Sequence, residues 1–178
     1  KVFRKMIESD LLGSPRKEKT KIKTLRITFD ELKKKLYVSD LVKFRITKTQ
    51  YPSYSNYKNL ISMVPVWKYK SEKRAISHVF HEIGHWTGSS ENLRRQGCMC
   101  VEDEKTKKYA IEETVAEIVS MMLCYKYGMK FVTPSAIKYI NKYLDPWYSD
   151  PEKKRKIIKT CITKAEAGFE IVERKLGL

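Results

Sequence analysis

The 178-residue chain contains no apolar run that approaches the roughly 18 residues of a membrane-spanning helix. It has only four cysteines, Cys98, Cys100, Cys124 and Cys161, and their spacing matches neither a disulfide scaffold nor a four-cysteine zinc site. We therefore expect no membrane partner and a reducing compartment, cytoplasmic or nuclear. Cys98 and Cys100 are close enough in sequence to share a metal site, but we favour two ordinary thiols on a loop.

Acidic residues are scarce relative to basic ones. The chain has 37 Lys and Arg against 21 Asp and Glu, which gives a formal net charge of +16 at pH 7. A surplus of this size suits a polyanionic partner, because each phosphate that is neutralised releases condensed counterions. Single-stranded DNA or another polyanion is thus a candidate partner, and a solvated basic surface without a partner is the alternative.

The remaining composition is that of a globular protein. Hydrophobic residues make up 42% of the chain, and its length is enough for one compact domain. Residues 1–24 are dense in lysine and include Gly13-Ser14-Pro15, which indicates a mobile basic arm or the end of a truncated upstream segment. We therefore assign residues 25–178 to the folded domain.

Apolar periodicity predicts an α+β fold that is mostly helical, with a small N-terminal β-hairpin or sheet packed on the helix that carries the histidines. Alternating residues predict a half-buried strand over 42–47, and the turn-rich segment 51–59 leads into a predicted edge strand over 60–64. Capping residues and helical spacing predict helices over residues 25–36, 71–88, 109–127, 133–144 and 151–177.

The segment His81-Glu82-Ile83-Gly84-His85 lies on the second of these helices. Residues four apart on an α-helix project from nearly the same line, so His81 and His85 can bind one ion. Glu82 is rotated by about 100 degrees from His81, which suits it to take a proton from a metal-bound water. The spacing predicts a zinc site with Glu82 as catalytic base; the alternative is a helix with two solvated or core-satisfied histidines.

Three carboxylates interrupt the otherwise apolar helix over residues 109–127. Buried carboxylates need a partner or a cation, and two histidines with one Glu are a common ligand set of catalytic zinc. We predict Glu113 as the third ligand, and Glu117, one turn further along, as the acceptor for the second ring N–H of a ligating histidine. For Glu112 we favour a solvated helix face, and for His78 a flanking polar residue outside the site.

Three segments together resemble the zincin-like metallopeptidase domain of the ArdC-type antirestriction proteins, which belong to mobile elements. They are His81 to Gly88, Asn92 to Arg95 and Tyr109 to Ile118. The similarity covers about residues 50–175, and its most specific part is the combination of His-Trp-Thr-Gly with Glu-Glu-x-x-Ala-Glu.

The resemblance implies a gluzincin-like site. His81 and His85 match the family's two histidine ligands, Glu82 its catalytic glutamate, and Glu113 its acidic ligand on the following helix. Family members usually carry an N-terminal domain that binds single-stranded DNA and is larger than the roughly 50 residues available here. The resemblance therefore bears on the metal more than on DNA.

Our first hypothesis is a zinc-dependent metallopeptidase that hydrolyses peptide bonds in a protein or peptide substrate. The predicted edge strand over 60–64 would hold an extended peptide by strand addition. Tyr109 is the first candidate for stabilising the oxyanion. The abundance of lysine is typical of an AT-rich coding genome, which favours a virus or mobile element as the source.

Our second hypothesis is a basic module of the antirestriction type that binds single-stranded DNA and has a structural or weakly active metal site. The residues proposed for phosphate contacts are Arg94, Arg95, Lys153, Lys154 and Arg155. Glu82 discriminates between the two hypotheses, because a structural zinc site favours four closed ligands and needs no carboxylate beside its first histidine. This favours the peptidase.

Overall fold

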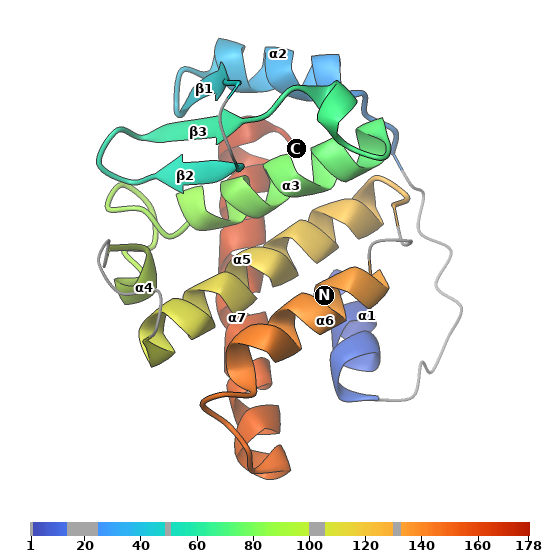
Figure 1. The fold of residues 1–178 in the computed structure, drawn as a ribbon, viewed down its shortest axis with the longest axis vertical. Helices are drawn as coiled ribbons and strands as arrows, with labels where there is room; N and C mark the ends of the chain where they lie inside the picture. Colours follow the sequence, from blue (N-terminus) through green and yellow to red (C-terminus); the bar gives the residue numbers. More distant parts are fainter. Residues whose placement is uncertain (1, 14–24, 49–50, 100–105, 130–132) are drawn as a thin grey trace.

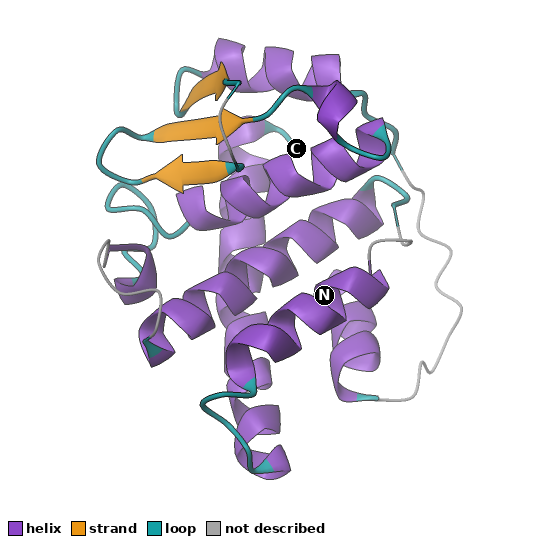
Figure 2. Ribbon diagram, in the orientation of Figure 1, coloured by secondary structure: helices purple, strands orange, loops and turns teal. Residues whose placement is uncertain are grey.

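The computed structural model describes residues 2–13, 25–48, 51–99, 106–129 and 133–178. Helices dominate these ranges, with a small three-stranded sheet, and the predicted α+β class is confirmed (Figure 1, Figure 2). The helices are α1 Val2–Leu12, α2 Phe29–Ser39, α3 Glu72–Trp86, α4 Gln96–Met99, α5 Lys107–Lys126, α6 Thr133–Leu144 and α7 Pro151–Leu176; η1 Val66–Lys68 is a 3-10 turn. The strands are β1 Lys43–Ile46, β2 Ser53–Ser55 and β3 Leu60–Met63. No helix in the described ranges combines the length and apolarity needed to cross a bilayer.

Side-chain caps fix where the helices begin. The Ser71 hydroxyl accepts a hydrogen bond from a backbone N–H of the first turn of α3, and Asp150 does the same for α7, which has proline at its first position. The helix predicted from residue 25 begins only at Phe29, because Thr28 and Glu31 form a capping box there. These caps confirm the predicted helices to within a few residues.

The sheet has the order β1-β3-β2, with β1 parallel and β2 antiparallel to β3. The prediction of an edge strand over 60–64 is therefore wrong, because β3 is the central strand and β2 is an edge. Ile61 and Met63 alternate toward the core and are fully buried. This alternation identifies the buried face of a strand, but it does not say what pairs with its hydrogen-bonding edges.

The N-terminal segment is not an arm over its first half. α1 packs on α5 and α7, with Met6 and Ile7 in the core, and Phe3 contacts the Phe169 ring. Arg4 also pairs with Glu166 of α7. These contacts make α1 part of the folded unit; residues 14–24 lie outside the described ranges, and the division of the chain at residue 24 stays a prediction.

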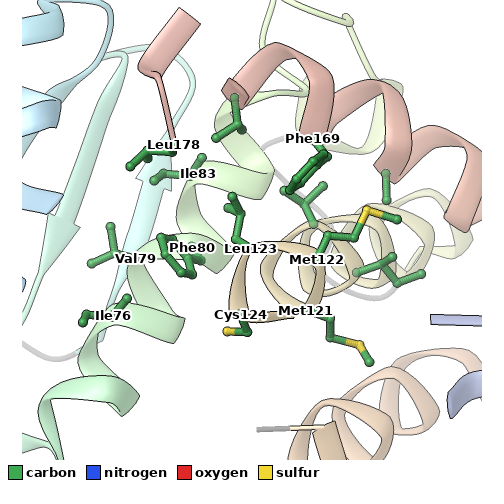
Figure 3. Packing of buried hydrophobic residues seen from close by; sticks show 14 of the residues in the cluster. Ile76, Val79, Phe80, Ile83, Met121, Met122, Leu123, Cys124, Phe169 and Leu178 are labelled. Carbon is green, nitrogen blue, oxygen red and sulfur yellow. The ribbon is translucent and has the colours of Figure 1, made fainter. Parts of the chain in front are cut away.

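The core is centred on α5, which lies between α3, α6 and α7 (Figure 1). One face of α3 contributes Ile76, Val79, Phe80 and Ile83 to it, and Figure 3 shows these side chains beside Leu123 and its neighbours on α5. The opposite face of α3 carries the histidines. Burial of the apolar face against α5 therefore fixes the direction in which the polar face points.

Gly84 lies where α3 and α5 approach each other most closely. A Cβ built at this position would lie 2.6 Å from the Ala116 carbonyl oxygen and 2.7 Å from the Ala116 Cα. Backbone atoms cannot move aside as a flexible side chain can, so any larger residue would push the helices apart. The glycine between the two histidines thus brings them within reach of the α5 carboxylates.

Candidate metal centre

His81 and His85 of α3 and Glu113 of α5 come together at the surface between these helices. The two Nε2 atoms are 3.2 Å apart. Glu113 Oε2 lies 3.4 Å from His81 Nε2, and Glu113 Oε1 lies 3.3 Å from His85 Nε2. The three residues form a group that can hold a metal ion.

The spacing of these atoms fits a tetrahedral site. With metal–nitrogen and metal–oxygen bonds of about 2.0–2.1 Å, the edges of a tetrahedron around zinc measure about 3.3 Å. The measured separations of 3.2, 3.3 and 3.4 Å agree with that edge. Two imidazoles and one carboxylate also suit other divalent ions, so the donor set fits zinc without selecting it alone.

Each histidine is held on its other ring nitrogen by a second carboxylate of α5. His81 Nδ1 lies 2.7 Å from Glu117 Oε2, which is the contact predicted for Glu117. His85 Nδ1 lies 3.1 Å from Glu112 Oε1. The prediction of a solvated Glu112 is wrong, because only 2% of this residue is exposed. A carboxylate on Nδ1 keeps the proton there and leaves Nε2 free to bind a metal.

Glu112 is in turn held by Arg95. The guanidinium donates to both carboxylate oxygens, from Nε and from Nη2, each at 2.7 Å. Its remaining contacts are also internal, since it donates to Thr87 Oγ1 and to the Gly84 carbonyl. Arg95 is 9% exposed. It is therefore a buried ion-pair partner, and not the phosphate contact that the sequence indicated.

Gly88 makes room for this arginine. A Cβ at position 88 would lie 2.7 Å from the Arg95 Cζ atom. The His-Trp-Thr-Gly segment thus has a structural meaning beyond its histidine: it ends α3, supplies the Thr87 hydroxyl, and leaves space for the side chain that holds Glu112.

The carboxylates set the charge state of the site. Burial lowers the pKa of His85, but its hydrogen bonds to Glu112 and Glu113 outweigh burial and raise this pKa to about 9. The pKa of His81 is raised as well, because Glu113 and Glu117 outweigh its burial. Conversely, the two histidines hold the pKa of the Glu113 carboxyl well below its usual range, despite burial. Glu113 therefore carries the negative charge that a metal ligand needs.

Glu82 occupies a different environment from the other acids. It is 5% exposed, and burial raises the pKa of its carboxyl, although the nearby histidines oppose this shift. It also accepts a hydrogen bond from the backbone N–H of Tyr54 on β2. A buried carboxylate with a raised pKa is suited to accept a proton near neutral pH, which is the role predicted from the sequence.

Tyr139 of α6 is a site residue that sequence reasoning missed. Its hydroxyl donates to Glu113 Oε2 at 2.5 Å, and its ring centroid lies 5.4 Å from that of His81. Burial and the neighbouring Glu113 raise the pKa of Tyr139, so the hydroxyl stays protonated. Tyr109, the predicted candidate, contacts Tyr143 at a ring distance of 5.9 Å. Tyr139 and Tyr143 are four residues apart on α6, a spacing that could have indicated a shared face.

The other residues singled out in the sequence lie around the site or away from it. Arg94 is exposed and donates to the Ser90 carbonyl. On α7, Lys153 is exposed, Lys154 pairs with Asp145, and Arg155 donates to the Leu12 carbonyl. Their proposed contacts with phosphate stay predictions.

His78 and Cys98 lie near the metal centre without joining the ligand group. The His78 ring packs on Tyr69 with centroids 5.2 Å apart. The Cys98 thiol donates to the His85 carbonyl, and burial raises its pKa to about 12. Cys98 is thus a protonated thiol that supports the end of α3, whereas Cys100 lies outside the described residues.

Comparison with known proteins agrees with this geometry. A family model for zincin-like metallopeptidases matches residues 33–161. The Mn(II)-bound crystal structure of the antirestriction protein ArdC from plasmid R388 is similar with a TM-score of 0.64 and 23% identity, over 85% of this chain and 55% of ArdC. The metal-free ArdC structure has the same TM-score and identity, over 90% of this chain and 56% of ArdC. No curated protein sequence matches. The chain thus shares a fold with ArdC and spans just over half of its length.

Proposed function

The chain belongs to the zincin-like metallopeptidase family, and we propose from this premise that it is a zinc-dependent peptidase acting on a protein or peptide substrate. The observation that carries the proposal is the convergence of His81, His85 and Glu113 on one point, with Glu82 on the same helix. Two histidines and a glutamate with one open position are typical of catalytic zinc, whereas structural zinc sites are closed by four ligands.

A divalent ion held by these three residues would supply Lewis-acid polarisation of the scissile carbonyl. The protein's own acid–base group in the proposed mechanism is Glu82. Its buried carboxylate takes a proton from the attacking water and then delivers it to the leaving amine, so that the group returns to its starting state. The raised pKa of Glu82 supports both halves of this transfer, because it brings proton uptake and release closer to neutral pH.

Glu117 and Glu112 orient the two histidines, and Arg95 orients Glu112. These residues act through others and are positioning residues. For the oxyanion we propose Tyr139 ahead of Tyr109, because its protonated hydroxyl already lies in the ligand group.

The substrate is proposed to lie along β2. This strand is an edge of the sheet, packs beside α3, and contributes the backbone N–H of Tyr54 that bonds to Glu82. An extended peptide beside β2 would bring its carbonyl groups next to the histidines. This replaces β3, which is central, as the strand that binds substrate.

Hydrolysis of an unfolded protein tests the proposed activity. We expect the zinc-loaded chain to cleave casein, to stop when a chelator removes the metal, and to resume when zinc is returned. The products are followed by mass spectrometry, which also gives the bonds cleaved. Failure to cut casein or a mixed peptide library, by protein that holds one metal ion per chain, would count against a peptidase.

Binding of single-stranded DNA is a second candidate function. It is supported by the net charge of +16 and by exposed basic residues such as Arg94 and Lys153. A labelled oligonucleotide should then bind at low salt and dissociate steeply as salt rises; no binding at low salt would remove this function. The free thiols of Cys98, Cys124 and Cys161 fit the cytoplasmic or nuclear compartment that we propose, in the host of a virus or mobile element.

A further inference from the structure

A pocket of about 290 Å³ adjoins the metal centre. Its walls come from α3, α5, α6 and the residues just before β2. His81, Glu82 and Tyr139 line the end that belongs to the metal centre, and Arg74, Ser77 and Ser135 are among the other lining residues. The pocket therefore joins the proposed reaction site to a second group of polar side chains that the mechanism does not use.

Arg74 is the only lysine or arginine among the lining residues in the part of the chain that the structure describes. It lies on the same face of α3 as the histidines, because positions 74, 78, 81 and 85 follow helical spacing. Seven residues separate it from His81, which corresponds to about 10 Å along the helix axis. Its guanidinium donates from Nη1 to Ser135 Oγ at 2.9 Å, which ties it to α6.

This part of the pocket is electrically positive. Arg74 lies in the first turn of α3, and Ser135 lies in the first turn of α6, so two helix N-termini add their positive ends to the guanidinium charge. The two lining carboxylates belong to the metal centre: Glu117 is bonded to His81, and Glu82 lies beside it. The Ser77 and Ser120 hydroxyls donate to backbone carbonyls of α3, so their oxygens remain able only to accept.

We propose that this pocket determines specificity by binding a carboxylate of the substrate, with Arg74 as the residue that recognises it. The inference rests on the proposed peptidase function. A guanidinium recognises a carboxylate through paired, charge-assisted hydrogen bonds, and it can do so while one N–H remains on Ser135. An extended peptide advances about 3.3 Å per residue, so the recognised group belongs within about three residues of the cleaved bond.

The carboxylate could come from an acidic side chain or from the C-terminus of a short peptide. Matched fluorogenic peptides separate these sources: one series places Glu or Gln at each of the three positions on either side of the cleaved bond, and another ends in a free carboxylate or an amide. We expect the acid in one of the series to give a kcat/KM about tenfold to a hundredfold above its neutral counterpart.

Substitution of Arg74 tests the assignment. Arg74→Met should remove the preference for the acid and leave cleavage of the neutral peptide and the zinc content unchanged, whereas the neighbouring exposed Lys73→Met should keep the preference. Equal rates for all acid and neutral pairs in the wild type, or an unaltered preference in Arg74→Met, would overturn the proposal.

Binding measurements separate this proposal from the proposed activity. Zinc-loaded Glu82→Gln protein, titrated with the labelled peptides, should bind the acidic member more tightly by a similar factor, and Arg74→Met on that background should equalise the two. If the chain cleaves no peptide yet shows this difference in affinity, the peptidase function fails and the carboxylate pocket stands. If peptides are cleaved and bound without regard to charge, the pocket assignment fails and the peptidase function stands.

Discussion

Glu82→Gln should lower kcat/KM for peptide hydrolysis by about 10²- to 10⁴-fold while the protein keeps its metal. The amide has nearly the shape of the carboxylate and can still accept the hydrogen bond from the Tyr54 backbone, so the site should stay assembled. It cannot take a proton from water, however. The rate with a fluorogenic peptide and the zinc content of the same sample together check this expectation.

Glu91→Gln is the matched control, because Glu91 is an exposed glutamate outside the pocket. It should turn over peptide at the wild-type rate. If Glu82→Gln with full metal content were as active as this control, proton transfer would have to be assigned to another group. A loss of zinc in Glu82→Gln would instead mean that Glu82 helps to hold the metal.

Arg95→Met is expected to cost the fold about 3–5 kcal/mol of unfolding free energy. The change leaves the carboxylate of Glu112 buried, with its bidentate partner removed and only His85 to balance it. An uncompensated charge in this environment is far more costly than the loss of a surface ion pair. Denaturant unfolding in the presence of a chelator measures the effect without any contribution from metal binding.

Arg94→Met provides the comparison, since the adjacent side chain is exposed and bonds only to a carbonyl among the contacts seen. Its unfolding free energy should stay within about 0.5 kcal/mol of the wild type. Adding Glu112→Gln to Arg95→Met should recover part of the loss, because the buried charge is then gone. A destabilisation by Arg95→Met no larger than that of Arg94→Met would contradict a buried ion pair at this position.

The local features of the fold were predictable from sequence because they depend on residues close together in the chain. Ser71 and Asp150 cap their helices through the backbone of the next turn, so their effect is visible in a short window. The same holds for His81 and His85, whose common direction follows from helical spacing. Glu113 was identifiable because a carboxylate in an apolar helix needs a cation or a partner.

The residues that sequence reasoning missed depend on contacts between distant segments. Arg95 and Glu112 are 17 positions apart, and nothing in either neighbourhood says that they meet. Tyr139 reaches Glu113 only because α6 packs on α5. The strand order was missed for a similar reason, since alternation shows which side chains of β3 are buried but not that β1 pairs with it in parallel.

Metal analysis of the wild type beside Glu113→Ala bears on the ligand group itself. The geometry of His81, His85 and Glu113 predicts one zinc ion per wild-type chain. It also predicts that Glu113→Ala binds zinc far more weakly, by more than the 10- to 100-fold typical of losing an outer partner. Protein without stoichiometric metal, or a Glu113→Ala variant that binds zinc as tightly as the wild type, would contradict the site described.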